Sequence, residues 1–126
     1  MDEERKSALQ RAGIDVDDAL GRFMGNEELL MQFLLKFPQD PNFPQLKEAM
    51  AHGDADRAFE AAHTLKGVTG NLSMKALSQQ VGLLVEDLRG GDFTGASGKM
   101  GQLEELYRNL TTVLEEQRSS NSSDRE

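Results

Sequence analysis

The sequence predicts an all-α fold, an antiparallel up-and-down four-helix bundle with short N-terminal helices packed at one end. Apolar residues recur three and four positions apart along most of the chain, which is the spacing of one helix face. Glycine, proline and helix-capping residues separate these segments at short intervals, and short connections favour antiparallel neighbours. No segment alternates apolar and polar residues as a strand does. At 126 residues, the chain is large enough for one domain with its own core.

Two short helices are expected before the long ones. Residues 2–11 form the first of them, and Gly13 ends it. Asp15 is placed to cap the second, because its side chain can accept a hydrogen bond from a free backbone N–H of the first turn. This second helix ends near Met24 and Gly25.

The first long rod, residues 27–52, is predicted to be kinked. Asn26 is placed to cap it. Its predicted apolar face comprises Leu29, Leu30, Phe33, Leu34 and Phe37. Proline lacks the amide that an internal helical hydrogen bond needs, so the prolines at positions 38, 41 and 44 interrupt the helix before it resumes over residues 43–52.

The next helix, residues 55–72, follows a stop at Gly53 and a cap at Asp54. Its predicted inward stripe comprises Ala55, Ala58, Ala62, Leu65, Thr69 and Leu72. At about 100° per residue, His63 lies roughly 130° from the mean direction of that stripe. The imidazole of His63 is therefore expected to point into solvent.

Two further helices complete the bundle, over residues 74–90 and 94–117. Ser73 is placed to cap the first of them, whose apolar residues lie near heptad spacing. The segment Gly90–Asp92 ends that helix and precedes the last one.

The expected organisation has three parts. Residues 1–13 form an N-terminal helical segment, and residues 14–117 form the bundle. The tail, residues 118–126, is serine-rich and polar, and a segment of that composition is predicted to be disordered because it has no apolar surface to bury.

Composition excludes several classes of function. The chain has no cysteine, which excludes disulfide scaffolds, zinc–thiolate sites and cysteine nucleophiles. Its formal charge of −8 argues against nucleic acid or an anionic membrane as a partner, because both need a cationic surface. The N-terminus is charged where a signal peptide is apolar, and no segment approaches the ~20 apolar residues of a membrane span. A cytoplasmic protein is therefore expected. We also expect the protein to be a monomer.

The most informative motif surrounds His63. Lys66 follows it by three residues, and Gly67 and Gly70 follow it by four and seven, so all four lie on one side of a helix. Each glycine inside a helix costs roughly 1 kcal/mol relative to alanine. What the two glycines provide is bare space beside the imidazole, which indicates a histidine that a large partner approaches closely.

The run His63-Thr64-Leu65-Lys66-Gly67, followed by Gly70-Asn71-Leu72, resembles the signature of the histidine-containing phosphotransfer (HPt) domains of bacterial two-component phosphorelays. The chain from about Ile14 to Glu116 fits the length and helical layout of such a domain. The resemblance implies that His63 is the phosphorylated residue and that Lys66 orients the phosphate.

The resemblance also implies a surface around His63 on which a partner docks. The candidate docking residues are Phe59, Glu60, Gly67, Val68, Gly70, Asn71 and Met74. Two of them have a second interpretation. Phe59 suits the edge of the core equally well. Glu60 either holds the second ring nitrogen of His63 or is a solvated carboxylate of the helix face.

The partners that the resemblance implies are receiver domains of response regulators and a sensor or hybrid histidine kinase. In such relays the receiver supplies the acceptor aspartate and the Mg²⁺, so this chain is expected to hold no cofactor and no metal of its own. The sequence contains neither of the glycine-rich nucleotide-binding loops. We therefore expect a phosphocarrier and not a kinase.

Other interpretations stay open. A non-catalytic helical module that binds a receiver or another partner without carrying phosphate would share the fold. A kinase's own phosphoacceptor domain would share the chemistry but differ in its donor. The sequence suits a free-standing protein and a domain of a hybrid kinase equally. A metal-binding bundle is disfavoured, because Glu60 and His63 form a single, outward-facing pair.

Overall fold

The computed structural model describes the backbone of residues 1–123 and the side chains of residues 1–119. All regular secondary structure in residues 1–123 is helical, which confirms the all-α prediction. The elements are α1 (Glu3–Arg11), α2 (Val16–Arg22), α3 (Glu27–Lys36), the 3-10 turn η1 (Phe37–Gln39), α4 (Asn42–Ala51), α5 (Ala55–Asn71), α6 (Lys75–Arg89) and α7 (Phe93–Ser123).

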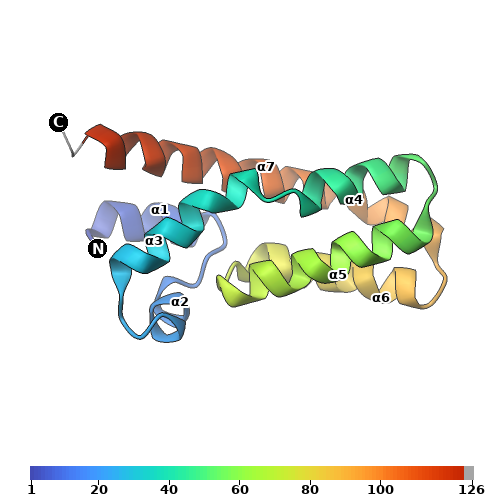
Figure 1. Ribbon diagram of the computed structural model, residues 1–126, viewed down its shortest axis with the longest axis horizontal. Helices are drawn as coiled ribbons and strands as arrows, with labels where there is room; N and C mark the ends of the chain where they lie inside the picture. Colours follow the sequence, from blue (N-terminus) through green and yellow to red (C-terminus); the bar gives the residue numbers. More distant parts are fainter. Residues whose placement is uncertain (124–126) are drawn as a thin grey trace.

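The segment from α3 through η1 to α4 forms one rod, and α5, α6 and α7 each form another. These rods run along the long axis of the molecule (Figure 1). Helix α5 packs against α4 and α6, α6 packs against α7, and α7 contacts α3 and η1. Helix α1 contacts α7, and α2 contacts α1 and α3, at the end of the molecule where the N-terminus lies (Figure 1).

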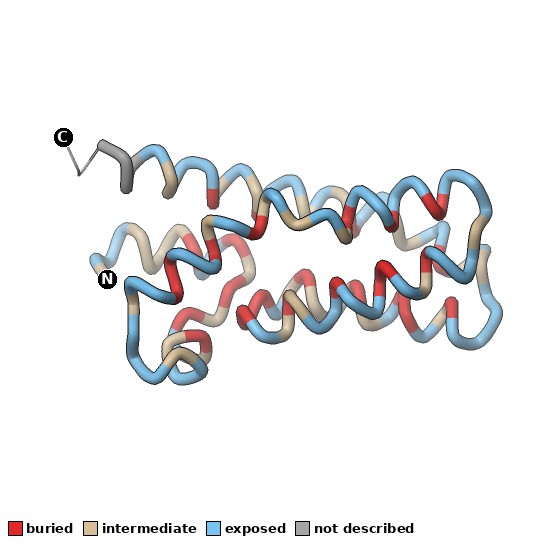
Figure 2. The backbone as a smooth tube through the Cα atoms, in the orientation of Figure 1, coloured by how far each residue is buried: buried red, intermediate tan, exposed pale blue. Residues whose placement is uncertain are grey.

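Buried residues lie on the sides of the rods that face one another (Figure 2). The largest fully buried side chains are Leu9, Val16, Leu30, Leu34, Leu46, Leu65, Met74, Val81, Leu84, Leu103, Leu110 and Leu114. Among the described residues, every buried polar side-chain atom has a hydrogen-bond partner. No described helix combines the length and the apolar character that crossing a membrane requires.

Side-chain caps begin several of the helices. Asp2, Asp15, Asn26 and Asp54 each accept a hydrogen bond from the backbone N–H three residues on, at 2.7 to 3.1 Å. The caps predicted at Asp15, Asn26 and Asp54 are therefore confirmed. Each satisfies a backbone donor that the first helical turn leaves free. Gly53, with φ +69°, turns the chain between α4 and α5 in a conformation that glycine adopts without steric penalty.

Ser73 does not cap the next helix, so that prediction is wrong. The residue is buried with φ +54°, and Met74 takes the N-cap position without a side-chain hydrogen bond. The Ser73 hydroxyl instead donates to Oδ2 of Asp18, 2.6 Å away on α2. A contact with a distant helix has replaced the local one, and it ties α2 to the turn between α5 and α6.

The buried face of α3 is rotated from the predicted one. Leu30, Leu34 and Phe37 are buried as expected, and Met31 is buried with them. Leu29 and Phe33 are 39% and 47% exposed. The inward face therefore follows positions i, i+1, i+4 and i+7, which is equally helical in spacing, and packing against α7 selects it.

Helix α7 continues beyond Gln117, which corrects the predicted disorder for residues 118–123. Residues 124–126, the rest of the predicted disordered tail, lie outside the described residues. Elongating a formed helix adds one backbone hydrogen bond for each residue ordered. Side-chain contacts support this end of the helix: the Arg118 guanidinium donates to the backbone carbonyl of Leu35, and Gln117 accepts from Nε of Arg5 at 2.9 Å.

Candidate functional site

Helix α5 buries one face and leaves the other open. Its buried residues are Ala58, Ala61, Ala62, Leu65 and Thr69. The predicted stripe is wrong at Ala55, which is exposed because it begins α5 at the end of the molecule where α4 and α6 also end. His63 is exposed, as its angle from the stripe predicts.

The two glycines after His63 have different surroundings. A Cβ atom added at Gly67 would meet nothing within 4 Å, so the surface one turn from His63 is open to solvent. A Cβ atom at Gly70 would lie 3.8 Å from Oγ of Ser78 on α6. Gly67 therefore provides the bare surface that the sequence predicts, whereas Gly70 lies against the neighbouring helix.

An aromatic side chain lies beside His63, and a cationic side chain lies over the aromatic ring. The ring of Phe59 is nearly parallel to the imidazole of His63, with an angle of 11° and 5.8 Å between ring centroids. The guanidinium carbon of Arg89, at the end of α6, lies 5.3 Å from the centroid of Phe59. Arg89 also pairs with Glu86, with 3.5 Å between Nε and Oε1. Helix α6 thus takes part in a site that the sequence places on α5 alone.

Lys66 is exposed and lies along α6. A Cβ atom added at Gly82 would be 3.6 Å from Cε and 4.0 Å from Nζ of Lys66. No carboxylate of the described residues lies within 4 Å of the Lys66 ammonium group. Its charge is therefore not neutralised by an ion pair and is available to an incoming anion.

Gly82 and Arg89 were not found from the sequence. Gly82 carries the same signal as Gly67, a glycine inside a helix that would be more stable with alanine. That signal does not say what lies opposite the glycine. Only the packing of α6 against α5 places it beside Lys66 and places Arg89 over Phe59.

Glu60 is exposed on α5, and in the described part of the chain no hydrogen bond joins it to His63. It borders a polar depression of about 280 Å³ between α4 and α5. The lining residues are Asn42, Gln45, Arg57, Glu60, Ala61 and Thr64. The role of Glu60 in holding the imidazole, or in docking, stays a prediction.

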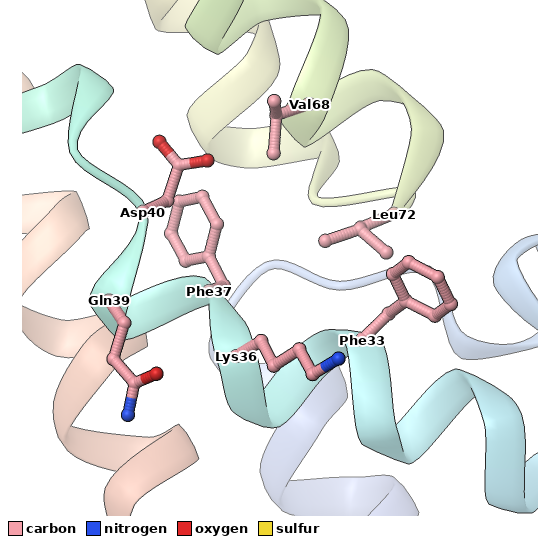
Figure 3. A pocket seen from close by; sticks show the side chains of 7 residues that line it. All are labelled: Phe33, Lys36, Phe37, Gln39, Asp40, Val68 and Leu72. Atoms are coloured by element: carbon pink, nitrogen blue, oxygen red, sulfur yellow. The ribbon is translucent and has the colours of Figure 1, made fainter.

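Val68 lies on another side of α5 from His63, since five residues correspond to about 140° around the helix. It lines a pocket of about 340 Å³ between α5 and the α3–η1 segment (Figure 3). The pocket is lined by Phe33, Lys36, Phe37, Gln39, Asp40, Val68 and Leu72. Asn71 is exposed near the end of α5. Docking roles for Val68 and Asn71 stay predictions, as do those of Phe59, Gly67 and Gly70.

Met74 is the one candidate that the structure removes from the surface. Its relative exposure is 0%, because it occupies the turn between α5 and α6 and points into the core. A partner cannot contact a side chain that is fully covered, so the docking role predicted for Met74 is wrong. Among the described residues, no three His, Asp or Glu side chains cluster as metal ligands would.

The Hpt domain family matches residues 28–117, a segment that runs from α3 into α7 and contains His63 and Lys66. The match covers more than half of the chain, and the protein therefore belongs to the Hpt domain family. Members of this family are phosphotransfer modules of two-component signalling, and they carry phosphate instead of acting as kinases. No curated protein and no solved structure gives a significant match.

Proposed function

We propose that the protein relays a phosphoryl group between the aspartates of receiver domains through a phosphohistidine at His63. The observation that carries the proposal is the exposed imidazole with open surface at Gly67 one turn away. Lys66, unpaired among the described residues, supplies a cation on the same face. The four rods are taken to form an antiparallel bundle that holds this face rigid.

The chemistry follows from the state of the imidazole. In its neutral form an imidazole carries a lone pair on one ring nitrogen and is nucleophilic. A ring-nitrogen lone pair attacks phosphorus, a P–N bond forms, and the P–O bond of the aspartyl phosphate breaks. The carboxylate of the donor leaves with the electron pair. Transfer to the next aspartate is the reverse reaction.

The protein contributes positioning and charge to this reaction. Negative charge spreads over the three oxygens of the group in transfer, and a nearby cation stabilises it. A lysine suits this role because its ammonium is a mobile point charge with three donors. The receiver contributes the acceptor aspartate and the Mg²⁺, so that the protein needs no cofactor of its own.

The proposal also names the source of the phosphate and the state in which the protein acts. The phosphate is taken to originate from a sensor or hybrid histidine kinase and to pass through receivers on both sides of the protein. We propose that the protein acts as a cytoplasmic monomer, because one exposed face at His63 is enough for each docking event in turn.

Intact-mass measurement tests the proposal directly. The protein is mixed with a phosphorylated receiver domain and Mg²⁺, beside a His63→Gln variant. We expect an acid-labile, base-stable gain of one phosphate that the variant does not show. If the receiver binds and neither protein gains phosphate, the chain is a non-catalytic interaction module and the relay is wrong.

A further inference from the structure

We propose that Gly82 of α6 is a positioning residue for Lys66. The bare backbone at Gly82 forms a seat along which the Lys66 side chain lies, and this seat keeps the ammonium beside α5 and the His63 face. The inference rests on the proposed function, in which Lys66 stabilises the phosphoryl group.

The contact is close and specific to this glycine. A Cβ atom at Gly82 would lie 3.6 Å from Cε, 4.0 Å from Cδ and 4.0 Å from Nζ of Lys66. These are ordinary van der Waals distances, so a methyl group fits and a larger side chain would overlap the lysine stem. The glycines at positions 98 and 101 of α7, also inside a helix, have nothing within 4 Å of an added Cβ.

The seat confines the lysine by shape and not by charge. A free lysine stem has four rotatable bonds, and ordering it costs side-chain entropy. Glu86, one turn after Gly82, is the natural carboxylate to attract Lys66, but it pairs with Arg89 at 3.5 Å. Lys66 is thereby held in place while its positive charge remains available.

Gly82→Leu tests the seat without weakening α6. Leucine is a better helix former than glycine, so the helix itself gains stability. The branched side chain displaces the Lys66 stem, and we expect the rate of phosphoryl transfer to fall about tenfold, as in Lys66→Ala, with a smaller change in receiver affinity. Gly82→Ala fits the observed space and should transfer at close to the original rate. Gly98→Leu, on an open face of α7, is the matched control.

A double substitution separates positioning from obstruction of the receiver. If Gly82 acts through Lys66, Gly82→Leu has no further effect on the transfer rate in a Lys66→Ala background. If the leucine instead obstructs docking, its effect persists in that background, and the positioning role is wrong.

A measurement that needs no phosphate tests the seat independently of the relay. Nuclear Overhauser effects in the unphosphorylated protein should connect the ε-methylene of Lys66 with the α-protons of Gly82. Their absence would overturn the seat even if His63 is phosphorylated. Their presence in a protein that never takes up phosphate would retain the seat and refute the proposed function.

Discussion

At the scale of single residues, His63 lies beside an aromatic ring that leaves the imidazole exposed. Phe59 lies one turn before it with a nearly parallel ring, and Arg89 lies over Phe59 from α6. Stacking on Phe59 favours the plane in which the imidazole lies. In the proposed relay His63 is the nucleophile, and a nucleophile that is already oriented loses less entropy when it reaches the transition state.

Replacing Phe59 should slow transfer without removing the nucleophile. Phe59→Ala loses the stacked ring, whose interaction is worth about 0.5 to 1.5 kcal/mol, and the rate should fall about threefold to tenfold. Single-turnover transfer from a phosphorylated receiver measures it. Phe59→Leu keeps apolar bulk and lacks the parallel ring, so it separates stacking from docking. If both variants transfer at the original rate, the ring does not orient His63.

In the proposed relay, Gly67 provides the clearance that a receiver needs. Gly67→Leu should leave the fold intact, because an added Cβ meets nothing within 4 Å and leucine favours the helix. The side chain would stand beside His63 and should weaken receiver binding and transfer by more than about tenfold. Thermal unfolding and a binding titration measure the two effects. The same substitution at Gly101 of α7, which also faces open space, should change neither. Unchanged transfer in Gly67→Leu would refute the clearance argument.

At the scale of elements, the turn between α5 and α6 is fixed to α2. Ser73 donates to Asp18, and the backbone N–H of Asp15 donates to the Ser73 carbonyl at 2.9 Å. The hydrogen bond from Ser73, followed by that from Arg22, lowers the pKa of Asp18 below its ordinary value. Helix α2 is thereby attached to the C-terminal end of α5, the helix that carries His63.

This attachment predicts how stability depends on pH. The pKa of Asp18 is lower in the folded than in the unfolded chain, so the unfolded chain takes up the proton first as pH falls. The stabilisation from Asp18 is complete above the unfolded pKa of about 3.9 and is lost as pH falls through the lower folded value. Ser73→Ala should make the acid-side loss of stability shallower in unfolding experiments from neutral to acidic pH. Ser97→Ala, at an exposed site, is the control, and equal acid-side slopes would contradict the role of Ser73.

At the scale of the whole molecule, the two ends of the chain are joined through α7. Arg5 of α1 bonds to Gln117, and Arg118 bonds to the carbonyl of Leu35 at the end of α3. The first contact involves Gln117, the last residue of the predicted bundle, and the second involves Arg118, the first residue of the segment predicted to be disordered. They connect segments that are far apart in the sequence, and so they help to close the bundle.

Arg118→Ala should destabilise the fold by about 1 kcal/mol, because it leaves a carbonyl without its donor. Chemical denaturation monitored by helical circular dichroism measures the change. Arg108→Ala is the matched control on the same helix, since the interaction of the Arg108 side chain among the described residues is an ion pair with Glu104 at 3.6 Å. Such pairs contribute little, so its effect should be near zero. Equal effects of the two substitutions would show that Arg118 does not join α7 to α3.

The sequence by itself determined the helices, three of their caps and the outward direction of His63. Caps at Asp15, Asn26 and Asp54 act on a backbone N–H three residues away, so local sequence is enough to predict them. The exposure of His63 likewise follows from the spacing of apolar residues on its own helix. These features depend on interactions within one or two helical turns.

Only the tertiary structure decided which residues meet across helices. It buried Met74, gave Ser73 a partner on α2, extended α7 past Gln117 and placed Gly82 beside Lys66. Each of these outcomes depends on the rotation and register of one rod against another. The spacing of apolar residues shows roughly which side of a helix is buried, but it does not give the exact rotation of the helix about its axis. Helix α3 is an example, because its buried face includes Met31. The close fit of side chains between rods then selects one arrangement.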